Sequence, residues 1–207
     1  MTVSERELQA YNEWTDNGLE RLRYEYDLNN TSVCFDLGTF HGDWAMDISN
    51  KYNRPTIYSF EILPAIYEVA RQNTLSYPNI HLFNYGIGKS SYHTTINVGE
   101  TDGASTSLFI DGDTKVEVDI KSIKEVFHEL QITSIDVMKL NVEGAEYDIL
   151  ECLIEDNLHL LVKNFQIQFH KMIPNYLDRY AAIREALAKS HKTTYDYYFV
   201  WENWKIK

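Results

Sequence analysis

Two acidic residues stand where short apolar segments of the sequence end, and the first of them leads into a glycine-containing turn. The stretch SVCFDLGTFHGDW places Asp36 at the end of an apolar run, with Gly38 and Gly42 close behind it. A dinucleotide-binding turn has the pattern G-x-G-x-x-G, in which glycines let the backbone approach the pyrophosphate. Here Phe40 takes the place of the middle glycine, and no Gly-Lys-Ser/Thr follows, so a phosphate-binding loop is excluded. A tight strand-to-helix turn without any ligand also satisfies this pattern.

The second acid, Glu61, ends the apolar segment TIYSFE and follows Asp36 by 25 residues. A buried carboxylate at a strand end is unfavourable unless something donates a hydrogen bond to it, and the two hydroxyls of a ribose are such donors. A salt bridge or solvent is the alternative partner. Two acids at neighbouring strand ends, without a phosphate cradle, fit a nucleoside that carries no phosphate. We therefore predict S-adenosylmethionine as the ligand, because its ammonium group, sulfonium and ribose all favour carboxylates.

If such a donor passes its methyl group to an alcohol, the protein needs one group that orients the acceptor oxygen and another that takes its proton. His170 ends the apolar segment FQIQFH, and its ordinary pKa of about 6.5 would let it accept that proton. A strand-end histidine with purely structural hydrogen bonds is the alternative. Asn141 follows the segment IDVMKL and is predicted to orient the acceptor oxygen, although an amide is not a base.

Three charged residues surround Asn141 in the sequence. Glu143 either contacts the substrate or compensates the dipole of the helix that follows it. Lys139, inside an apolar strand, is predicted to pair with Glu143 or Glu146. Asn141, Glu143 and His170 together have ligand types that suit Mg²⁺ or Mn²⁺, but no short ligand spacing supports a metal site, so none is predicted.

Further residues are predicted to surround the two ligands. The cofactor set is completed by residues of the glycine turn and of the next two strand ends: Gly42, Asp43, Ile62, Asn84, Tyr85 and Gly86. Alternatives stay open for Asp43, as a helix cap, and for Tyr85, as a core residue. Ser105 in the segment DGASTSLF and Arg21 near the N-terminus are candidates for substrate binding. A solvated turn and a solvated helix face are the alternatives for these two.

To position these residues, the chain must alternate strands and helices. Strands are predicted over 32–37, 56–61, 79–85, 135–140, 165–170 and 195–201. Helices are predicted over 43–51, 64–76, 122–130 and 176–190, with one more that starts near 145. The chain is expected to be a single domain over 1–207, with an N-terminal helical cap over 1–31 and a β-rich insert over 86–123.

Short, continuously apolar strands that alternate with helices indicate an α/β fold with a mainly parallel sheet and helices on both faces. Ligands of such sheets bind beyond the carboxyl ends of the strands, where the candidate residues stand. The C-terminal stretch YDYYFVWENWKIK is predicted to be an edge strand with a partly exposed aromatic surface. Such a surface would support a homodimer.

Composition excludes several classes of partner. The 207 residues include 19 Lys plus Arg against 31 Asp plus Glu, a net charge of −12. Proteins that bind nucleic acids or anionic membranes need a basic footprint, so neither partner is expected. Both cysteines lie in apolar runs, which indicates buried thiols and a cytoplasmic protein. The polar first 20 residues do not resemble a signal peptide, and no apolar run approaches the roughly 20 residues that span a bilayer.

The stretch SIDVMKLNVEGAEYDILE resembles the D-x-x-K-x-D-x-E-G-x-E motif of FkbM-type methyltransferases. The resemblance extends to VCFDLGTFHGDW, IYSFEILP, FNYGIGKSSYHTTINVG and GASTSL, and so covers about two thirds of the chain. Two positions depart from the family pattern. Asn141 stands where the family has Asp, and Thr39-Phe40-His41 stand where the family has a small residue with a polar one.

The resemblance implies a class I methyltransferase fold, with S-adenosylmethionine across the carboxyl edge of the sheet. It also implies O-methylation of hydroxyl groups on sugars, nucleotide-activated sugars or secondary metabolites. Two alternatives from other classes stay open. One is an NAD(P)-dependent oxidoreductase or epimerase on a similar sheet, which Phe40 disfavours. The other is a catalytically silent domain that binds S-adenosylmethionine, an alternative that Asn141 keeps open.

Overall fold

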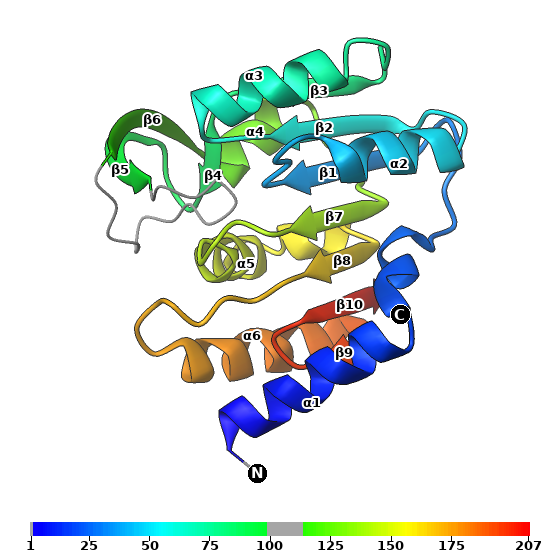
Figure 1. Ribbon diagram of the computed structural model, residues 1–207, viewed down its shortest axis with the longest axis vertical. Helices are drawn as coiled ribbons and strands as arrows, with labels where there is room; N and C mark the ends of the chain where they lie inside the picture. The colour runs from blue at the N-terminus through cyan, green and yellow to red at the C-terminus, as the bar shows by residue number, and fades with distance from the viewer. Residues whose placement is uncertain (1, 99–113) are drawn as a thin grey trace.

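A seven-stranded sheet forms the centre of the protein, in the order β3-β2-β1-β7-β8-β10-β9 (Figure 1). The structure is a computed structural model that describes residues 2–98 and 114–207. The strands of this sheet are β1 (Val33–Leu37), β2 (Thr56–Phe60), β3 (Ile80–Phe83), β7 (Val137–Leu140), β8 (Asn164–Ile167), β9 (His191–Tyr197) and β10 (Trp201–Ile206). Strands β3, β2, β1, β7 and β8 run parallel, and β10 and β9 are antiparallel additions. The predicted α/β fold with a mainly parallel sheet is confirmed.

Helices cover both faces of this sheet (Figure 1). They are α1 (Val3–Asp16), α2 (Asp43–Lys51), α3 (Pro64–Asn73), α4 (Ile123–Glu129), α5 (Glu146–Glu155) and α6 (Tyr176–Ser190), with 3₁₀ helices η1 (Leu19–Tyr24) and η2 (Leu158–Leu161). Apolar side chains of α2, such as Trp44 and Ile48, pack on Cys34 and Ile57 on one face. Helices α4, α5 and α6 pack on the opposite face within the main core. Among the described residues, no helix is long and apolar enough to cross a bilayer.

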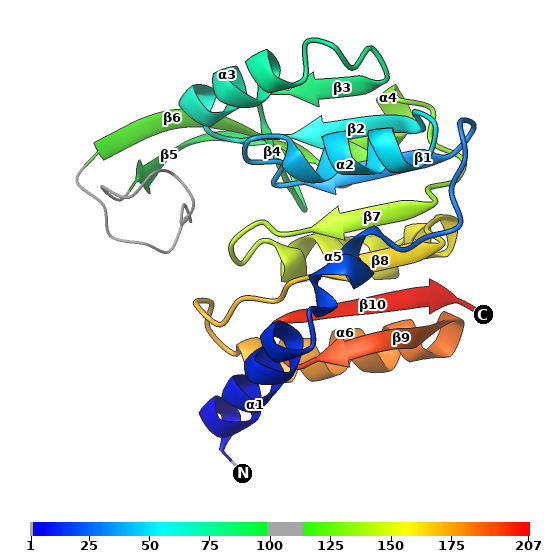
Figure 2. The same cartoon turned by 45° about the vertical axis from the view of Figure 1, so that its right-hand side comes forward.

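A second, smaller sheet follows β3 in the chain. It contains β4 (Gly86–Gly88), β6 (Thr114–Ser122) and β5 (Tyr92–Val98), in that order. Figure 2 shows it beyond the edge at which β1, β2, β3 and β7 end. Ile96 and Val118 of this sheet pack against Leu63, which precedes α3. Strands β4, β5 and β6 therefore occupy the region predicted as a β-rich insert, and they stand beside the carboxyl ends of the main strands.

The C-terminal prediction was wrong in two respects. The structure has two antiparallel strands, β9 and β10, where the sequence suggested one strand over 195–201. Phe199 adopts φ 55 in the turn between them, so the aromatic run is interrupted in its middle. Tyr198, Phe199, Trp201 and Trp204 are all at most 8% exposed. Tyr195 and Tyr197 of β9 are partly exposed, so the aromatic surface is smaller than expected and the homodimer stays a prediction.

A row of buried polar side chains crosses five strands of the main sheet in register. Ser59 is the partner of Asp36, Asp36 of Lys139, Lys139 of Gln166, and Gln166 of Asn203. Each of the five is at most 4% exposed. Residues paired in register project to the same face of a sheet, so these polar groups lie side by side within an otherwise apolar layer. We call them the polar row.

Candidate active site

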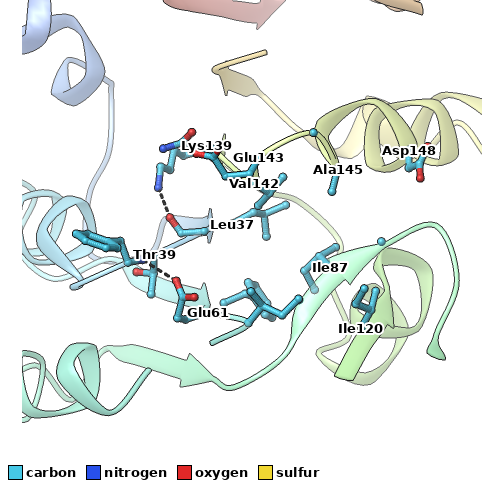
Figure 3. Close-up of a pocket in the computed structure, with 18 of the residues that line it drawn as sticks. Leu37, Thr39, Glu61, Ile87, Ile120, Lys139, Val142, Glu143, Ala145 and Asp148 are labelled. Carbon is cyan, nitrogen blue, oxygen red and sulfur yellow. Dashed lines mark hydrogen bonds between the residues drawn. The ribbon is translucent and has the colours of Figure 1, made fainter. Parts of the chain in front are cut away.

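A cavity of about 510 Å³ opens at the carboxyl edge of the main sheet (Figure 3). Its walls come from the ends of β1, β2 and β7, from the start of α5, and from β4 and β6 of the small sheet. This is the edge at which parallel α/β sheets bind their ligands. Of the residues predicted as sites, Gly38, Asp43, Glu61, Ile62, Gly86, Asn141 and Glu143 line it.

The turn after β1 is shaped by positive backbone angles. Gly38 has φ 78, and a Cβ added there would lie 2.0 Å from the backbone oxygen of Asn141. Phe40 has φ 53 and Gly42, which precedes α2, has φ 90. Backbone N–H groups of Gly38 and Thr39 donate to the Phe60 carbonyl at 3.1 and 3.0 Å. Gly38 is therefore required by the close approach of the β1 and β7 loops, which places the cavity wall at this point.

Asp36 lies beneath the cavity rather than on its wall. Its side chain is fully buried, and its Oδ1 accepts a hydrogen bond from the Lys139 Nζ at 2.8 Å. The Thr39 hydroxyl donates to its other oxygen at 2.6 Å. Lys139 Nζ donates at 2.6 Å to the Gly38 carbonyl as well, so one ammonium joins β7 to the glycine turn. Lys139 was expected to pair with Glu143 or Glu146; the structure pairs it with Asp36 instead, its neighbour in register.

Of the two predicted strand-end acids, Asp36 and Glu61, it is Glu61 that faces the cavity (Figure 3). It is 7% exposed, and its two oxygens accept the backbone N–H groups of Phe40 at 2.9 Å and Leu63 at 3.0 Å. Burial raises the pKa of the Glu61 carboxyl, against the two hydrogen bonds, which lower it. Each carboxylate oxygen has a second lone pair, so Glu61 can accept further hydrogen bonds from a ligand such as a ribose.

Asn141 is the first residue after β7 and lines the cavity. Its Oδ1 is buried, and within the described part of the chain it accepts no hydrogen bond. A buried acceptor without a partner is unfavourable by about 1–3 kcal/mol. Glu143, two residues on, lines the same wall and has φ 51, an angle that residues other than glycine rarely adopt. Strained backbone at a cavity is typical of functional sites.

His170 does not lie where the sequence suggested. Strand β8 ends at Ile167, and the imidazole is outside the residues that line the cavity. Its Nδ1 lies 2.7 Å from Glu146 Oε1 and its Nε2 lies 3.3 Å from Glu143 Oε1. Burial lowers the pKa of His170, but the hydrogen bonds to Glu143 and Glu146 outweigh it and raise that pKa to about 10. An imidazole that already holds its proton at neutral pH is unsuited to the predicted role of proton acceptor.

Asn84 and Tyr85 are not among the residues that line the cavity. The amide Nδ2 of Asn84 donates to the Glu61 carbonyl at 2.9 Å, so it supports the strand end that carries Glu61. The ring of Tyr85 packs beside Phe60 and Phe83, at centroid distances of 5.7 and 5.5 Å. Burial raises the pKa of Tyr85 to about 12, which keeps its hydroxyl neutral. The open alternative of Tyr85 as a packing residue agrees with this placement.

The N-terminal segment contributes other residues than expected. Arg21 is exposed and paired with Glu25 at 2.9 Å, whereas Arg23 and Tyr24 line the cavity. The indole of Trp44 donates to the Arg23 carbonyl at 3.1 Å and so anchors this segment on α2. Ser105 lies outside the described residues. Arg21 and Arg23 both lie in the 3₁₀ helix η1, but only Arg23 lines the cavity. The spacing of the N-terminal sequence does not show which of the two faces the cavity.

The far end of the cavity was missed by the sequence patterns. Lys89, Tyr92, Asp148, Ile173 and Arg179 line it, from the small sheet, α5 and the segments around α6. These residues come from separate parts of the chain and form no motif. Among the described residues, no group of three or more His, Cys, Asp and Glu side chains is arranged to hold a metal ion.

Comparisons with known proteins agree with this architecture. A family model described as the methyltransferase FkbM domain matches residues 36–190. Among solved structures, the chain is similar to Aeropyrum pernix fibrillarin with natively bound S-adenosyl-L-methionine, at 12% identity and a TM-score of 0.53, over 94% of this chain and 75% of that one.

Two further structures have the same fold. One is the Methanococcus jannaschii fibrillarin pre-rRNA processing protein, at 12% identity and a TM-score of 0.52, over 88% of this chain and 71% of that one. The other is a dimethyladenosine transferase from Plasmodium falciparum, at 11% identity and a TM-score of 0.52, over 92% and 62% of the two chains. No curated protein sequence matches the chain.

Proposed function

The chain belongs to the FkbM methyltransferase family, and from this premise we propose that it methylates a hydroxyl group of a small molecule, with a sugar or a nucleotide-activated sugar as the acceptor class. The methyl donor is S-adenosylmethionine, which supplies an electrophilic methyl group on a sulfonium. The chain itself must hold this donor, orient the acceptor oxygen and remove the acceptor's proton.

The residues at the β1 and β2 ends fit the donor. Glu61 offers a desolvated carboxylate on the cavity wall, which suits a ribose diol. Gly38 and Asp43 form the wall beside it, and Ile62 and Gly86 provide an apolar surface that suits an adenine ring. The Gly-Lys-Ser/Thr pattern of a phosphate-binding loop is absent from this turn, and S-adenosylmethionine carries no phosphate.

The observation that carries the proposal is the orphan acceptor atom of Asn141. Its Oδ1 is buried at the cavity and lacks a hydrogen-bond donor among the described residues. On a polyhydroxylated acceptor, a hydroxyl next to the attacking one can donate to this atom, which orients the acceptor and leaves the proton of the attacking hydroxyl for a base. The geometry of Asn141 thereby favours a hydroxylated acceptor.

We assign the removal of the proton to Glu143 rather than to His170. Glu143 lines the cavity two residues from Asn141, while His170 contacts Glu143 from behind. In the reaction, the acceptor oxygen forms a bond to the methyl carbon, the carbon–sulfur bond breaks with its electron pair left on sulfur, and the hydroxyl proton passes to the Glu143 carboxylate. His170, protonated between Glu143 and Glu146, holds that carboxylate in place.

An RNA acceptor is disfavoured, although two of the structural neighbours are described as acting in RNA processing or on adenosine. At 11–12% identity these neighbours share the fold with this chain. The net charge of −12 provides no basic footprint for a polynucleotide. A small acceptor agrees better with a cavity of about 510 Å³.

The test is turnover. S-adenosylhomocysteine release is measured with a panel of hydroxylated acceptors, and the product is identified by mass as an O-methyl ether. Methylation of a hydroxyl supports the proposal, and methylation confined to amines or to RNA overturns it. Binding of S-adenosylhomocysteine without turnover on any acceptor would favour the silent binding domain. A rise in melting temperature with NAD(P) alone would favour the oxidoreductase.

A further inference from the structure

Among the described residues, the cations that line the cavity are already neutralised by carboxylates of the protein. They are Arg23, Lys89, Lys139 and Arg179. Each makes an ion pair with at least one acid that does not line the cavity: Glu20, Glu155, Asp36 and Glu151, respectively. A site that recognises phosphate normally presents cationic donors that are open to the ligand.

Arg179 illustrates this most clearly, because a guanidinium fork is the usual partner of a phosphate. Its Nε donates to Glu151 Oε1 at 2.7 Å and its Nη2 donates to Glu151 Oε2 at 2.6 Å. The same Nη2 lies 2.5 Å from Asp148 Oδ1. The guanidinium also lies 5.3 Å from the centre of the Tyr147 ring. The Nε–Nη2 face of this arginine is therefore occupied by a carboxylate in the bidentate geometry that a phosphate would use.

The other three cations are held in different ways. Lys139 is only 4% exposed and bonded to Asp36 and to the Gly38 carbonyl. Arg23 is paired with Glu20, and its guanidinium lies 4.2 Å above the Trp201 ring. Lys89 has a half-exposed side chain and makes the weakest of these pairs, 2.9 Å from Glu155. One half-exposed ammonium does not balance the charge of a diphosphate.

Acceptor atoms, by contrast, are in excess at the cavity. Asn141 Oδ1 lacks a donor within the described residues, and the carboxylates of Asp43, Glu61 and Glu143 line the same walls. The sequence over 99–113 contains four acidic residues and neither Lys nor Arg, so it supplies no cation wherever it lies. A ligand must bring hydrogen-bond donors to this site. Polyols and ammonium groups have donors, whereas phosphates and sulfates have only acceptors at neutral pH.

We infer that the methyl acceptor carries no phosphate or sulfate: it is a free polyhydroxylated molecule, neutral or with an amine, and not a nucleotide-activated sugar. This inference rests on the proposed function of the same site and narrows its acceptor class. A diphosphate would have to compete with Glu151 and Asp148 for Arg179 and would bring like charges near Glu143, and both effects weaken its binding.

The first experiment does not depend on the identity of the acceptor. UDP and inorganic pyrophosphate are titrated by calorimetry into the protein saturated with S-adenosylhomocysteine, so that the donor end of the cavity is filled. We expect no binding stronger than a Kd of about 1 mM for either probe. A Kd below that value for either probe overturns the inference. Failure of S-adenosylhomocysteine to bind would instead count against the proposed function.

A charge variant supplies the matched comparison. Glu151→Gln removes the carboxylate that occupies the Arg179 fork and should strengthen pyrophosphate binding by about tenfold or more relative to wild type. Glu185→Gln, an exposed residue of α6, makes the same change in net charge and should leave pyrophosphate binding unchanged. Equal pyrophosphate affinity in Glu151→Gln and Glu185→Gln would contradict the claim that Glu151 keeps Arg179 from binding a phosphate.

Turnover provides the second readout. Each free sugar in the panel is assayed beside its phosphate and its nucleotide diphosphate derivative. Methylation of free members in preference to their phosphorylated partners supports the inference, and methylation restricted to phosphorylated members overturns it. If no member is methylated while S-adenosylhomocysteine binds, the proposed function fails, and the pyrophosphate titration still decides the charge preference of the cavity.

Discussion

The Nδ1 atom of His170 lies 2.7 Å from Oε1 of Glu146, a carboxylate with no solvent exposure. Glu146 also accepts the backbone N–H groups of Val142 and Gly144, each at 2.9 Å. The Tyr147 hydroxyl donates to the His170 carbonyl at 2.8 Å. These contacts attach the segment after β8 to the loop that carries Asn141 and Glu143, so His170 fixes the shape of this part of the cavity wall.

Removing this imidazole should destabilise the fold. His170→Ala leaves the Glu146 carboxylate buried without its cationic partner, and breaking a buried pair in this way costs about 3–5 kcal/mol. Urea unfolding measures the loss. The exposed histidine variant His93→Ala, in the small sheet, serves as the control and should lose little, because its partners are exposed. A loss from His170→Ala below about 1 kcal/mol would show that the contact contributes little.

The pH dependence of this contribution has a definite sign. The pKa of His170 is raised in the folded state to about 10, above its value of about 6.5 in an unfolded chain. Its contribution is therefore complete below about pH 6.5 and is lost as the pH rises through about 10. The difference in unfolding free energy between wild type and His170→Gln should shrink between pH 6 and about pH 10.5. A difference that grows with pH would contradict the assigned protonation state.

Glu61→Gln should weaken binding of S-adenosylhomocysteine by about 10- to 100-fold, because charge-assisted hydrogen bonds contribute about 1.5–3 kcal/mol. Since burial raises the pKa of Glu61, wild-type affinity should fall with decreasing pH sooner than an ordinary glutamate would cause. Calorimetry provides both measurements. Glu68→Gln, whose exposed side chain pairs with Arg71, is the control with the same charge change. Affinity unchanged within about threefold in Glu61→Gln would remove Glu61 from the ribose site.

Replacing Asn141 by leucine should raise the stability of the fold and lower turnover. Asn141→Leu replaces a buried acceptor without a partner by an apolar side chain, so unfolding should require about 1–3 kcal/mol more free energy than in wild type. The same variant should lose turnover, because it cannot orient the acceptor hydroxyl. Asn141→Asp, which restores the residue usual in the family, should retain turnover. Thermal melting and S-adenosylhomocysteine release distinguish these outcomes, and full turnover in Asn141→Leu would exclude the orienting role.

Gly38→Ala should lower the free energy of unfolding by more than the strain of a positive φ alone explains. A Cβ at Gly38 would lie 2.0 Å from the Asn141 backbone oxygen, so the β1 and β7 loops must separate. Gly18→Ala is a matched control, because Gly18 has φ 60 but no heavy atom within 4 Å of the added Cβ. The control should lose about 1–2 kcal/mol and Gly38→Ala clearly more, as measured by urea unfolding. Equal losses would show that the loops accommodate the methyl group.

Local patterns were sufficient for much of the fold. Helices 43–51 and 176–190 have the bounds predicted from their sequences, because apolar periodicity and flanking polar residues act within one turn of the helix. The strand ends at Leu37 and Leu140 were also predicted at the correct residue. The C-terminal hairpin was missed because β9, HKTTYDY, is polar and half exposed and lacks the apolar run that marked the other strands.

The candidate site shows where sequence patterns fail. Lys139 was assigned to Glu143 or Glu146, which are close to it in the chain, but its partner Asp36 is 103 residues away and is its neighbour in register. That pairing depends on which strands are neighbours in the sheet, and the spacing of residues along the chain does not show this. His170 was placed at a strand end three residues beyond the observed one. The segment after β8 brings its ring to Glu146 and not to the cavity.

The polar row has a consequence for errors in strand alignment. Asp36 and Lys139 neutralise each other only when β1 and β7 pair in the observed register. A slip of β7 by one residue would turn Lys139 toward the apolar layer of Phe35 and leave Asp36 buried opposite an apolar side chain. Misaligned sheets therefore carry two unpaired buried charges, whereas a purely apolar strand pair would tolerate the slip.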